Sequence, residues 1–316
     1  MRTVSTMGFA GAAALSFCFP DFVVFRFTEA VVWAIALLGL VILCGISGQF
    51  SFAQAALFGM GGYAAALLVN HTSLSVHWAL ILAPLVGYGA GYGLGRIAGG
   101  HSIWTQALMS YALAVAFPQL LRWRPIEDFT GGVQGLYLDA PKAPLAAISN
   151  DRWCCLLALA ALALAAWVTA NVTRGRSGRA LAAARDHDLA AAAQGIDVVA
   201  VRAVASGLAG AYIALAGCLS AFQFGFVGPT SYNLALSLQM LFGLVVGGMN
   251  SIAGAIVGGL ILEFLPGWVA GLGKGLSALL FAALMIAAIV AMPTGITGAA
   301  RRLLAKFGIP RPAAAG

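Results

Sequence analysis

Charged side chains are scarce in this chain of 316 residues. They make up 9% of it, whereas hydrophobic residues make up 61%, and the mean hydropathy is +0.95. A soluble domain carries about 25% charged residues. Because so few polar side chains could not cover a water-facing surface, the composition excludes a soluble enzyme and a disordered chain. The apolar runs do not alternate in polarity as the strands of a membrane β-barrel do, which favours helices over a barrel. The sequence predicts an all-α, polytopic membrane helix bundle.

Motifs for catalysis and for cofactor or metal binding are also lacking. The chain has no GxxxxGK[ST] nucleotide-binding loop, no HExxH and no GxSxG. Its five cysteines form no CxxC pair, and we interpret them as small apolar residues within helices. Glu29 and Glu263 are the acids expected at membrane depth, both near helix ends and Glu29 in a first helical turn. We therefore predict no enzyme, no cofactor and no metal site, and active transport would need energy from another subunit.

Apolar runs bounded by glycine, proline or charge predict about ten membrane spans in a single domain, residues 1–316. The expected spans are about 4–20, 28–46, 58–69, 78–98, 103–121, 153–172, 203–222, 234–248, 252–270 and 275–292. A mixed loop at 122–152, a polar loop at about 173–202 and a basic tail at about 293–316 connect or follow them.

The charges are distributed unevenly between the two expected membrane faces. With the N-terminus inside, the inner segments hold 11 of the 17 basic residues and three of the 10 acidic ones. Positive charge is retained on the cytoplasmic side of membrane proteins, so we predict that both termini are cytoplasmic and that residues 122–152 lie outside. We attribute the net charge of +7 to basic residues in the cytoplasmic loops. The sequence has no run of basic residues interleaved with aromatic ones, so we expect no nucleic-acid partner.

Two spans, 58–69 and 234–248, are short for a membrane core of about 30 Å. Polar, glycine-containing stretches precede them, beginning near Ser47 and Gln223. Broken helices of this kind line substrate paths in transporters, and the alternative is a kinked helix packed against its neighbours. The candidate path residues are Gln49, Ser51, Gln54, Gln223 and Asn233.

The two stretches share a pattern of Cys, Gln, Phe and Phe at equal spacing, beginning at Cys44 and at Cys218. The expected topology places them at opposite membrane faces, so the pattern suggests an inverted repeat; chance matching is the alternative. Glycines four residues apart, such as Gly87 and Gly91, predict close helix packing.

The inner loop at 173–202 predicts a short, alanine-rich helix outside the membrane. Ser177 is expected to cap its start, Gly195 to end it in a left-handed turn, and Asp197 to cap the next span. Leu181, Ala184 and Leu189 should share one face. The alternative is an ordinary solvated connection.

This loop resembles the EAA-type coupling loop of ABC importer permeases, and the chain resembles more closely the branched-chain amino acid permeases of LivM type. The segments that carry the resemblance are Gly48–Tyr63, Thr130–Leu136, Ser177–Asp197 and Pro293–Ile296. The long loop before span 153–172 favours LivM over its LivH-type partner.

The resemblance implies a permease subunit in a bacterial inner membrane, paired with a LivH-like permease. Two ATPase subunits and an extracytoplasmic solute-binding protein would complete the importer. The ATPases would grip the 177–196 loop, where the candidate coupling residues are Gly178, Arg179, Ala180, Arg185, Asp186 and Gly195.

Two functions remain open at this point. The first is a permease for branched-chain or other small amino acids, driven by partner ATPases. The second is an ATP-independent carrier or channel for a small polar solute such as urea or an amide. The inner loop favours the first, because a carrier needs no docking helix for an ATPase; a structural subunit without a pore would not need broken polar helices.

Overall fold

The computed structural model describes residues 20–72, 75–139, 141, 149–270 and 295–298. The expected spans 4–20 and 275–292 and most of the expected tail at 293–316 lie outside these residues, so the count of ten spans stays a prediction.

Helices form most of the described chain. They are α2 (Asp21–Leu40) with its π-helical continuation η1 (Val41–Ile46), α3 (Gln54–His71), η2 (Val76–Trp78), α4 (Ala79–Ala98), α5 (Ile103–Leu121), α6 (Arg124–Thr130), η3 (Gly132–Gln134), α7 (Asn150–Arg174), α8 (Arg176–Asp186), α9 (Asp188–Ala193), α10 (Val198–Phe224), η4 (Pro229–Ser231), α11 (Leu234–Gly247) and α12 (Ile252–Ala270). Two short strands, β1 (Leu136–Tyr137) and β2 (Phe226–Val227), pair antiparallel.

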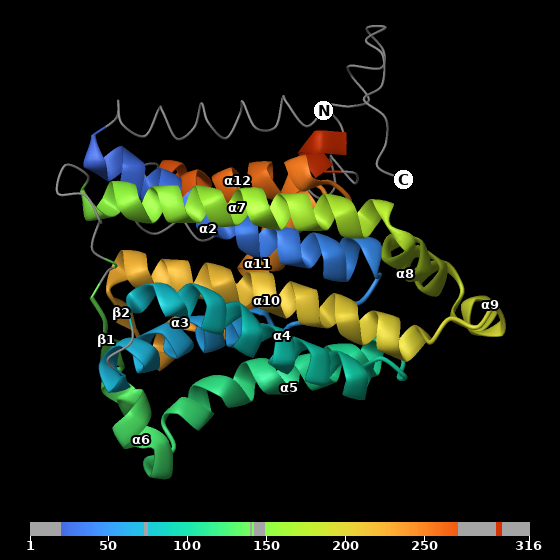
Figure 1. Cartoon of the computed structure of the whole chain (residues 1–316), viewed down its shortest axis with the longest axis horizontal. Coiled ribbons are helices and arrows are strands. Elements are labelled where there is room, and N and C mark those ends of the chain that lie inside the picture. Colours follow the sequence, from blue (N-terminus) through green and yellow to red (C-terminus); the bar gives the residue numbers. More distant parts are fainter. Residues whose placement is uncertain (1–19, 73–74, 140, 142–148, 271–294, 299–316) are drawn as a thin grey trace, which may run out of the picture.

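The long helices pack in layers with their axes roughly along one direction (Figure 1). Helices α7, α2 and α12 lie together, and α10 packs beneath them against α3 and α4. Helix α5 lies at the edge of the bundle. The α8–α9 pair projects at one end, while α6 and the β1–β2 pair lie at the other.

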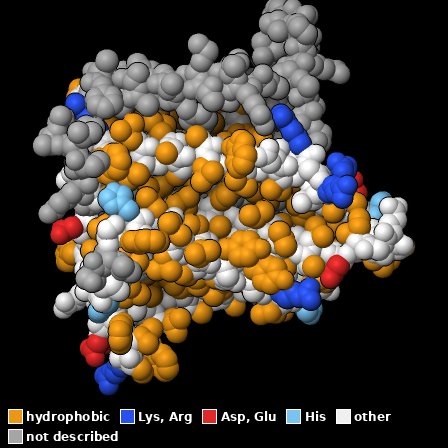
Figure 2. Space-filling model, viewed as in Figure 1, with side chains coloured by type: hydrophobic (Ala, Val, Ile, Leu, Met, Phe, Trp, Pro, Cys, Tyr) orange, Lys and Arg blue, Asp and Glu red, His pale blue; other side chains and the backbone are white. Residues whose placement is uncertain are grey.

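The surface of the bundle suits a membrane. Hydrophobic side chains cover the middle of the face shown in Figure 2, and charged side chains gather toward its two ends. Four described helices are long and apolar enough to cross a bilayer: Asp21–Ile46, Val76–Ala98, Asn150–Arg174 and Val198–Phe224. The predicted all-α membrane bundle is confirmed.

Two expected helix starts are wrong. The helix predicted to begin at 28 begins at Asp21, which places Glu29 beyond the first turn, buried against other helices rather than capping an end. The helix predicted at 58–69 begins at Gln54 and has 18 residues, a rise of about 27 Å. Helix α11 is short as predicted, with 14 residues.

Glycine allows close contact between α4 and α10. A Cβ at Gly87 or Gly91 would overlap backbone carbonyl oxygens of α10, so side chains are excluded along this stripe. On the other face of α4, a Cβ at Gly89 would meet nothing within 4 Å. The predicted packing role of the spaced glycines is confirmed.

Candidate translocation path and coupling element

The first helix break, residues 47–53, is held by buried polar side chains. The Gln49 amide nitrogen donates to the Ser47 hydroxyl at 2.7 Å and to the Arg202 carbonyl at 3.0 Å. The Ser206 hydroxyl donates to the Gln49 amide oxygen at 3.1 Å. Gln49 therefore joins the break to α10 and meets its hydrogen-bonding needs there, as a buried amide must.

A small cavity lies beside this break. It has a volume of about 20 Å³, enough for about one water and far too little for an amino acid. Its polar lining comes from Gln49, Ser51, Gln106, Ser110 and Ser206. Such a lining suits water or a polar solute, and in the described conformation the space is too small for anything larger than water.

Gln54, at the start of α3, is more deeply buried than Gln49 and Ser51. Its side chain is 1% exposed; the amide nitrogen donates to the Ser51 carbonyl at 2.6 Å, while the amide oxygen is buried without a hydrogen-bond partner among the described residues. One residue on, the Ala55 backbone N–H donates to the Ser237 hydroxyl of α11 at 2.9 Å. The starts of α3 and α11 thus meet inside the protein.

The two predicted path residues at the second break, between α10 and α11, lie in different surroundings. Gln223 donates to the Phe25 carbonyl of α2 at 2.6 Å. Asn233 is exposed and caps α11, accepting from the Leu236 N–H at 3.1 Å. Gln223 therefore ties helices together, whereas Asn233 is open to the surroundings.

The five predicted path residues do not form one cluster. Gln49 packs near the start of α10 through Arg202 and Ser206, while Gln223 is at its end, about 25 Å further along the helix. The proposed sequence repeat also fails in detail, because Gln49 follows the left-handed Gly48 whereas Gln223 precedes the left-handed Gly225. The two breaks lie at opposite ends of α10, but the shared residues do not hold equivalent positions.

The inner loop forms two helices rather than one. Helix α8 begins at Arg176 with Gly175 as its cap and no capping side chain, so the expected cap at Ser177 is wrong. The chain leaves the helix at His187 and resumes as α9. Leu181 and Ala184 are buried on the bundle, but Leu189 is 88% exposed, because the interruption turns α9 away from the face that α8 uses.

The end of this element agrees with the sequence. Gly195 has φ +81°, and the Ile196 N–H donates back to the Ala191 carbonyl at 3.1 Å. Asp197 caps α10 by accepting from the Ala200 N–H at 2.9 Å. Both predictions are confirmed, since each rests on local backbone rules.

The six predicted coupling residues divide into two groups. Arg179, Asp186 and Gly195 are exposed and Ala180 is half-buried. Gly178 is buried where a Cβ would overlap the Thr173 carbonyl. Arg185 is also exposed, but its side chain reaches across Gly48 and donates to the Gly45 carbonyl at the end of η1, so it contacts the bundle itself.

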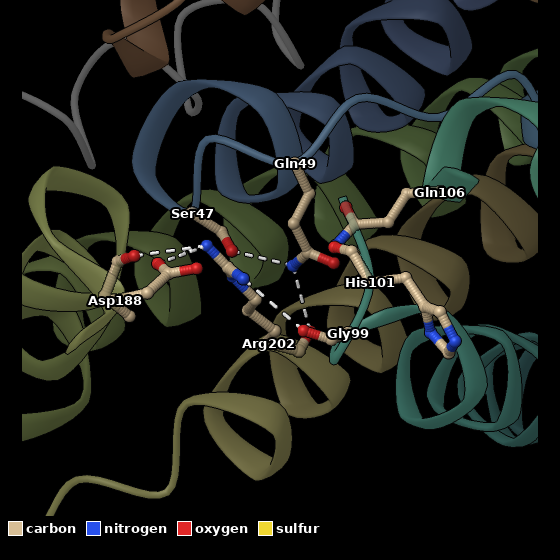
Figure 3. Close-up of polar contacts among 8 residues, drawn as sticks. Ser47, Gln49, Gly99, His101, Gln106, Asp188 and Arg202 are labelled. Carbon is tan, nitrogen blue, oxygen red and sulfur yellow. Dashed lines mark hydrogen bonds and ion pairs between the residues drawn. The ribbon is translucent and has the colours of Figure 1, made fainter. Parts of the chain in front are cut away.

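Arg202 is a central residue that the sequence did not single out (Figure 3). Its guanidinium donates to Asp188 at 2.6 Å, to the Ala184 carbonyl at 3.2 Å and to the Gly99 carbonyl at 3.4 Å. One side chain near the start of α10 thus joins α8, α9 and the turn between α4 and α5. The sequence feature that could have identified Arg202 is its position as a single charged residue in the apolar first turns of α10.

Comparisons with known proteins agree with this architecture. The sequence model of a family described as "Branched-chain amino acid transport system / permease component" matches residues 22–289. The LivM permease protein of a high-affinity branched-chain amino acid transport system from Salmonella typhimurium is 26% identical over 266 residues, covering 74% of this chain and 60% of that protein. The LivM protein of Escherichia coli is 25% identical with the same coverage.

A LivH permease protein also matches. The one from Salmonella typhimurium is 25% identical over 306 residues, covering 84% of this chain and 91% of that protein. No solved structure matches. The chain spans about 60% of the length of the LivM relatives, but the family match at 22–289 covers most of the chain itself. The chain therefore belongs to the family of permease components of branched-chain amino acid transport systems.

Proposed function

We propose that this chain is a permease subunit of an ABC importer that carries branched-chain or other small amino acids. The observation that carries the proposal is the α8–α9 pair, which projects beyond the long helices at one end of the bundle (Figure 1). A carrier working alone has no need of such an element. Membership of the permease family supports the same conclusion.

The exposed side of α8–α9 is the docking surface for an ATPase subunit. Arg179, Asp186 and Leu189 are exposed on it, and Leu189 offers an apolar contact that a groove on the partner can enclose. Gly178 and Arg185 act from the opposite side, where they hold α8 against the bundle.

The translocation path runs along the two breaks. Gln49 and Ser51 line the small polar cavity near the α8–α9 end, and Asn233 is exposed at the start of α11. Because the cavity admits about one water, the described conformation is closed at that end and must open for an amino acid to pass.

The proposed complex holds a second, LivH-like permease, two ATPase subunits and an extracytoplasmic solute-binding protein. The α8–α9 end faces the cytoplasm of a bacterium, where the basic residues of the inner segments belong. Residues 122–152 then face outward, where they can meet the binding protein.

Reconstitution of the chain in vesicles with these partners tests the proposal. We expect uptake of labelled leucine that requires the binding protein and ATP, and that stops when the partner ATPases carry an inactive nucleotide site. Uptake of urea or an amide by the chain without ATPases would support a carrier or channel instead and overturn the proposal.

A further inference from the structure

We propose that Arg202 is the positioning residue that transmits movement of the α8–α9 pair to the polar break at Gln49. The inference rests on the proposed function, and it names the route by which ATPase movement would reach the path. It begins from one juxtaposition: the Arg202 side chain binds the coupling element, while its backbone binds the break (Figure 3).

The Arg202 guanidinium is anchored on several elements at once. Its side chain is 13% exposed, and the 2.6 Å ion pair with Asp188 is its shortest contact. The further bonds to the Ala184 and Gly99 carbonyls hold the planar group in one orientation. The guanidinium can bind these partners together because its N–H donors are held in one plane, whereas the single ammonium group of lysine could not make the same set of bonds. A shift of α9 therefore acts directly on Arg202.

The backbone of Arg202 carries the second half of the connection. Its carbonyl accepts from Gln49 at 3.0 Å, and Ser206, one helical turn further, donates to the other end of the same amide. Gln49 and Ser206 both line the closed polar cavity. Movement of the first turns of α10 must therefore change the hydrogen bonds between two residues that line this cavity.

Arg185 provides a parallel contact on the other side of the break. It donates to the Gly45 carbonyl before the break, and its Cγ lies 2.7 Å from the place that a Cβ on Gly48 would occupy. The last turn of α8 thus touches the break directly. Residues 45–49 are therefore held from two points, by Arg185 of α8 directly and by Arg202 of α10, whose side chain binds Asp188 of α9.

The test compares two aspartates at the same end of the molecule. Asp188→Asn removes the charge that holds Arg202. Asp197→Asn is the matched control, because asparagine caps a helix as well as aspartate and only an exposed contact with Arg96 at 4.0 Å is lost. Each is made with Ser51→Cys in a chain whose five native cysteines are replaced, and each is reconstituted with the full transporter.

We expect Asp188→Asn to lower the solute carried per ATP hydrolysed by about threefold, the size suited to a half-exposed ion pair. The rate at which a small aqueous reagent labels the thiol introduced by Ser51→Cys should rise on ATP turnover in the control. This rise on ATP turnover should be about threefold smaller in Asp188→Asn. Arg202→Lys should fall between them, since it keeps the charge but not the fork.

The outcomes separate the two proposals. If the Ser51→Cys parent shows no ATP-driven uptake while the unmodified chain does, Gln106→Cys, which also lines the cavity, replaces it as the reporter in the same comparison. If the unmodified chain shows none, the proposed function fails. If uptake is normal and Asp188→Asn matches Asp197→Asn in both coupling and labelling, Arg202 has no positioning role.

Discussion

At the scale of single residues, Gly195 shows how the coupling element depends on one backbone conformation. Its φ is +81°, yet a Cβ there would meet nothing within 4 Å. Within this chain, any effect of a substitution must therefore come from the backbone and not from crowding. At most other described glycines a substitution would also change the packing, because they lie against neighbouring atoms.

Replacing Gly195 with valine should disturb the turn between α9 and α10 by about 1–2 kcal/mol, since a β-branched residue resists the left-handed region. We expect lower transport per ATP hydrolysed with normal membrane insertion. The measurement is uptake and ATPase activity in the reconstituted importer.

Asparagine is the matched control at this position, because it tolerates left-handed φ far better than valine. Gly195→Asn should retain most of the coupling. Equal loss in both variants would show that the glycine serves contact with the ATPase and not backbone geometry.

Residue-scale features were predictable from the sequence only where they are local. The turn at Gly195 and the cap at Asp197 follow from neighbours within about one helical turn. The contacts of Arg202 could not be foreseen, since its partners Gly99 and Gln49 are 103 and 153 residues away in sequence. The exposure of Leu189 was missed because the interruption at His187 carries no proline or glycine signal.

At the scale of elements, the contact between α4 and α10 depends on glycine. Gly91 lies against the Ser206 backbone, whereas Gly89 on the same helix faces away from it. Helices in a membrane gain little from the hydrophobic effect, so close backbone approach supplies much of their association.

Gly91→Leu should force α4 and α10 apart, at a cost of about 1–3 kcal/mol for overpacking. Gly89→Leu adds the same side chain where there is space and should be neutral or slightly stabilising, since leucine favours helix more than glycine does. Thermal unfolding of the purified protein in detergent measures both. Equal melting temperatures would show that this contact does not limit stability.

The two helix breaks give a prediction at the same scale. Cysteines placed singly at Gln49, Ser51, Gln54, Gln223 and Asn233, in a cysteine-free chain, should differ in reactivity with a small aqueous reagent. Asn233→Cys should react readily because it is exposed, and Gln54→Cys should react slowly because it is buried. Gln49→Cys and Ser51→Cys should react faster during ATP turnover.

Protection of all five sites in every nucleotide state would contradict the proposed path. Both breaks were predictable from the sequence, because glycine and polar residues interrupt the apolar runs there. The start of α3 was not, since the polar Gln54 begins the helix four residues before the predicted start at 58 and is 1% exposed.

At the scale of the whole molecule, the bundle has two chemically different ends. The described residues place Arg96, four arginines of the 174–185 segment and Arg202 at the α8–α9 end, with three aspartates. The opposite end holds α6 and the β1–β2 pair, where acids outnumber basic residues. The difference in charge between the two ends was predictable from the loops, because basic residues are retained on one side of the membrane in every loop along the chain.

Reporters fused at the two ends should therefore give opposite results. A reporter near Asp139, which is exposed, should be active only outside the cytoplasm, and one near Leu189 only inside it. Fusions that keep transport activity are the control for correct folding. Cytoplasmic activity at Asp139 would reverse the proposed orientation.

The π-helical turn at Val41–Ile46 has a consequence for how this family can change in evolution. A π turn holds one more residue than an α turn, so deleting a single residue there would restore a regular helix while the break after it keeps nearly its present orientation. Relatives whose segment is one residue shorter at this point should therefore keep both the polar break and the arginine that corresponds to Arg185.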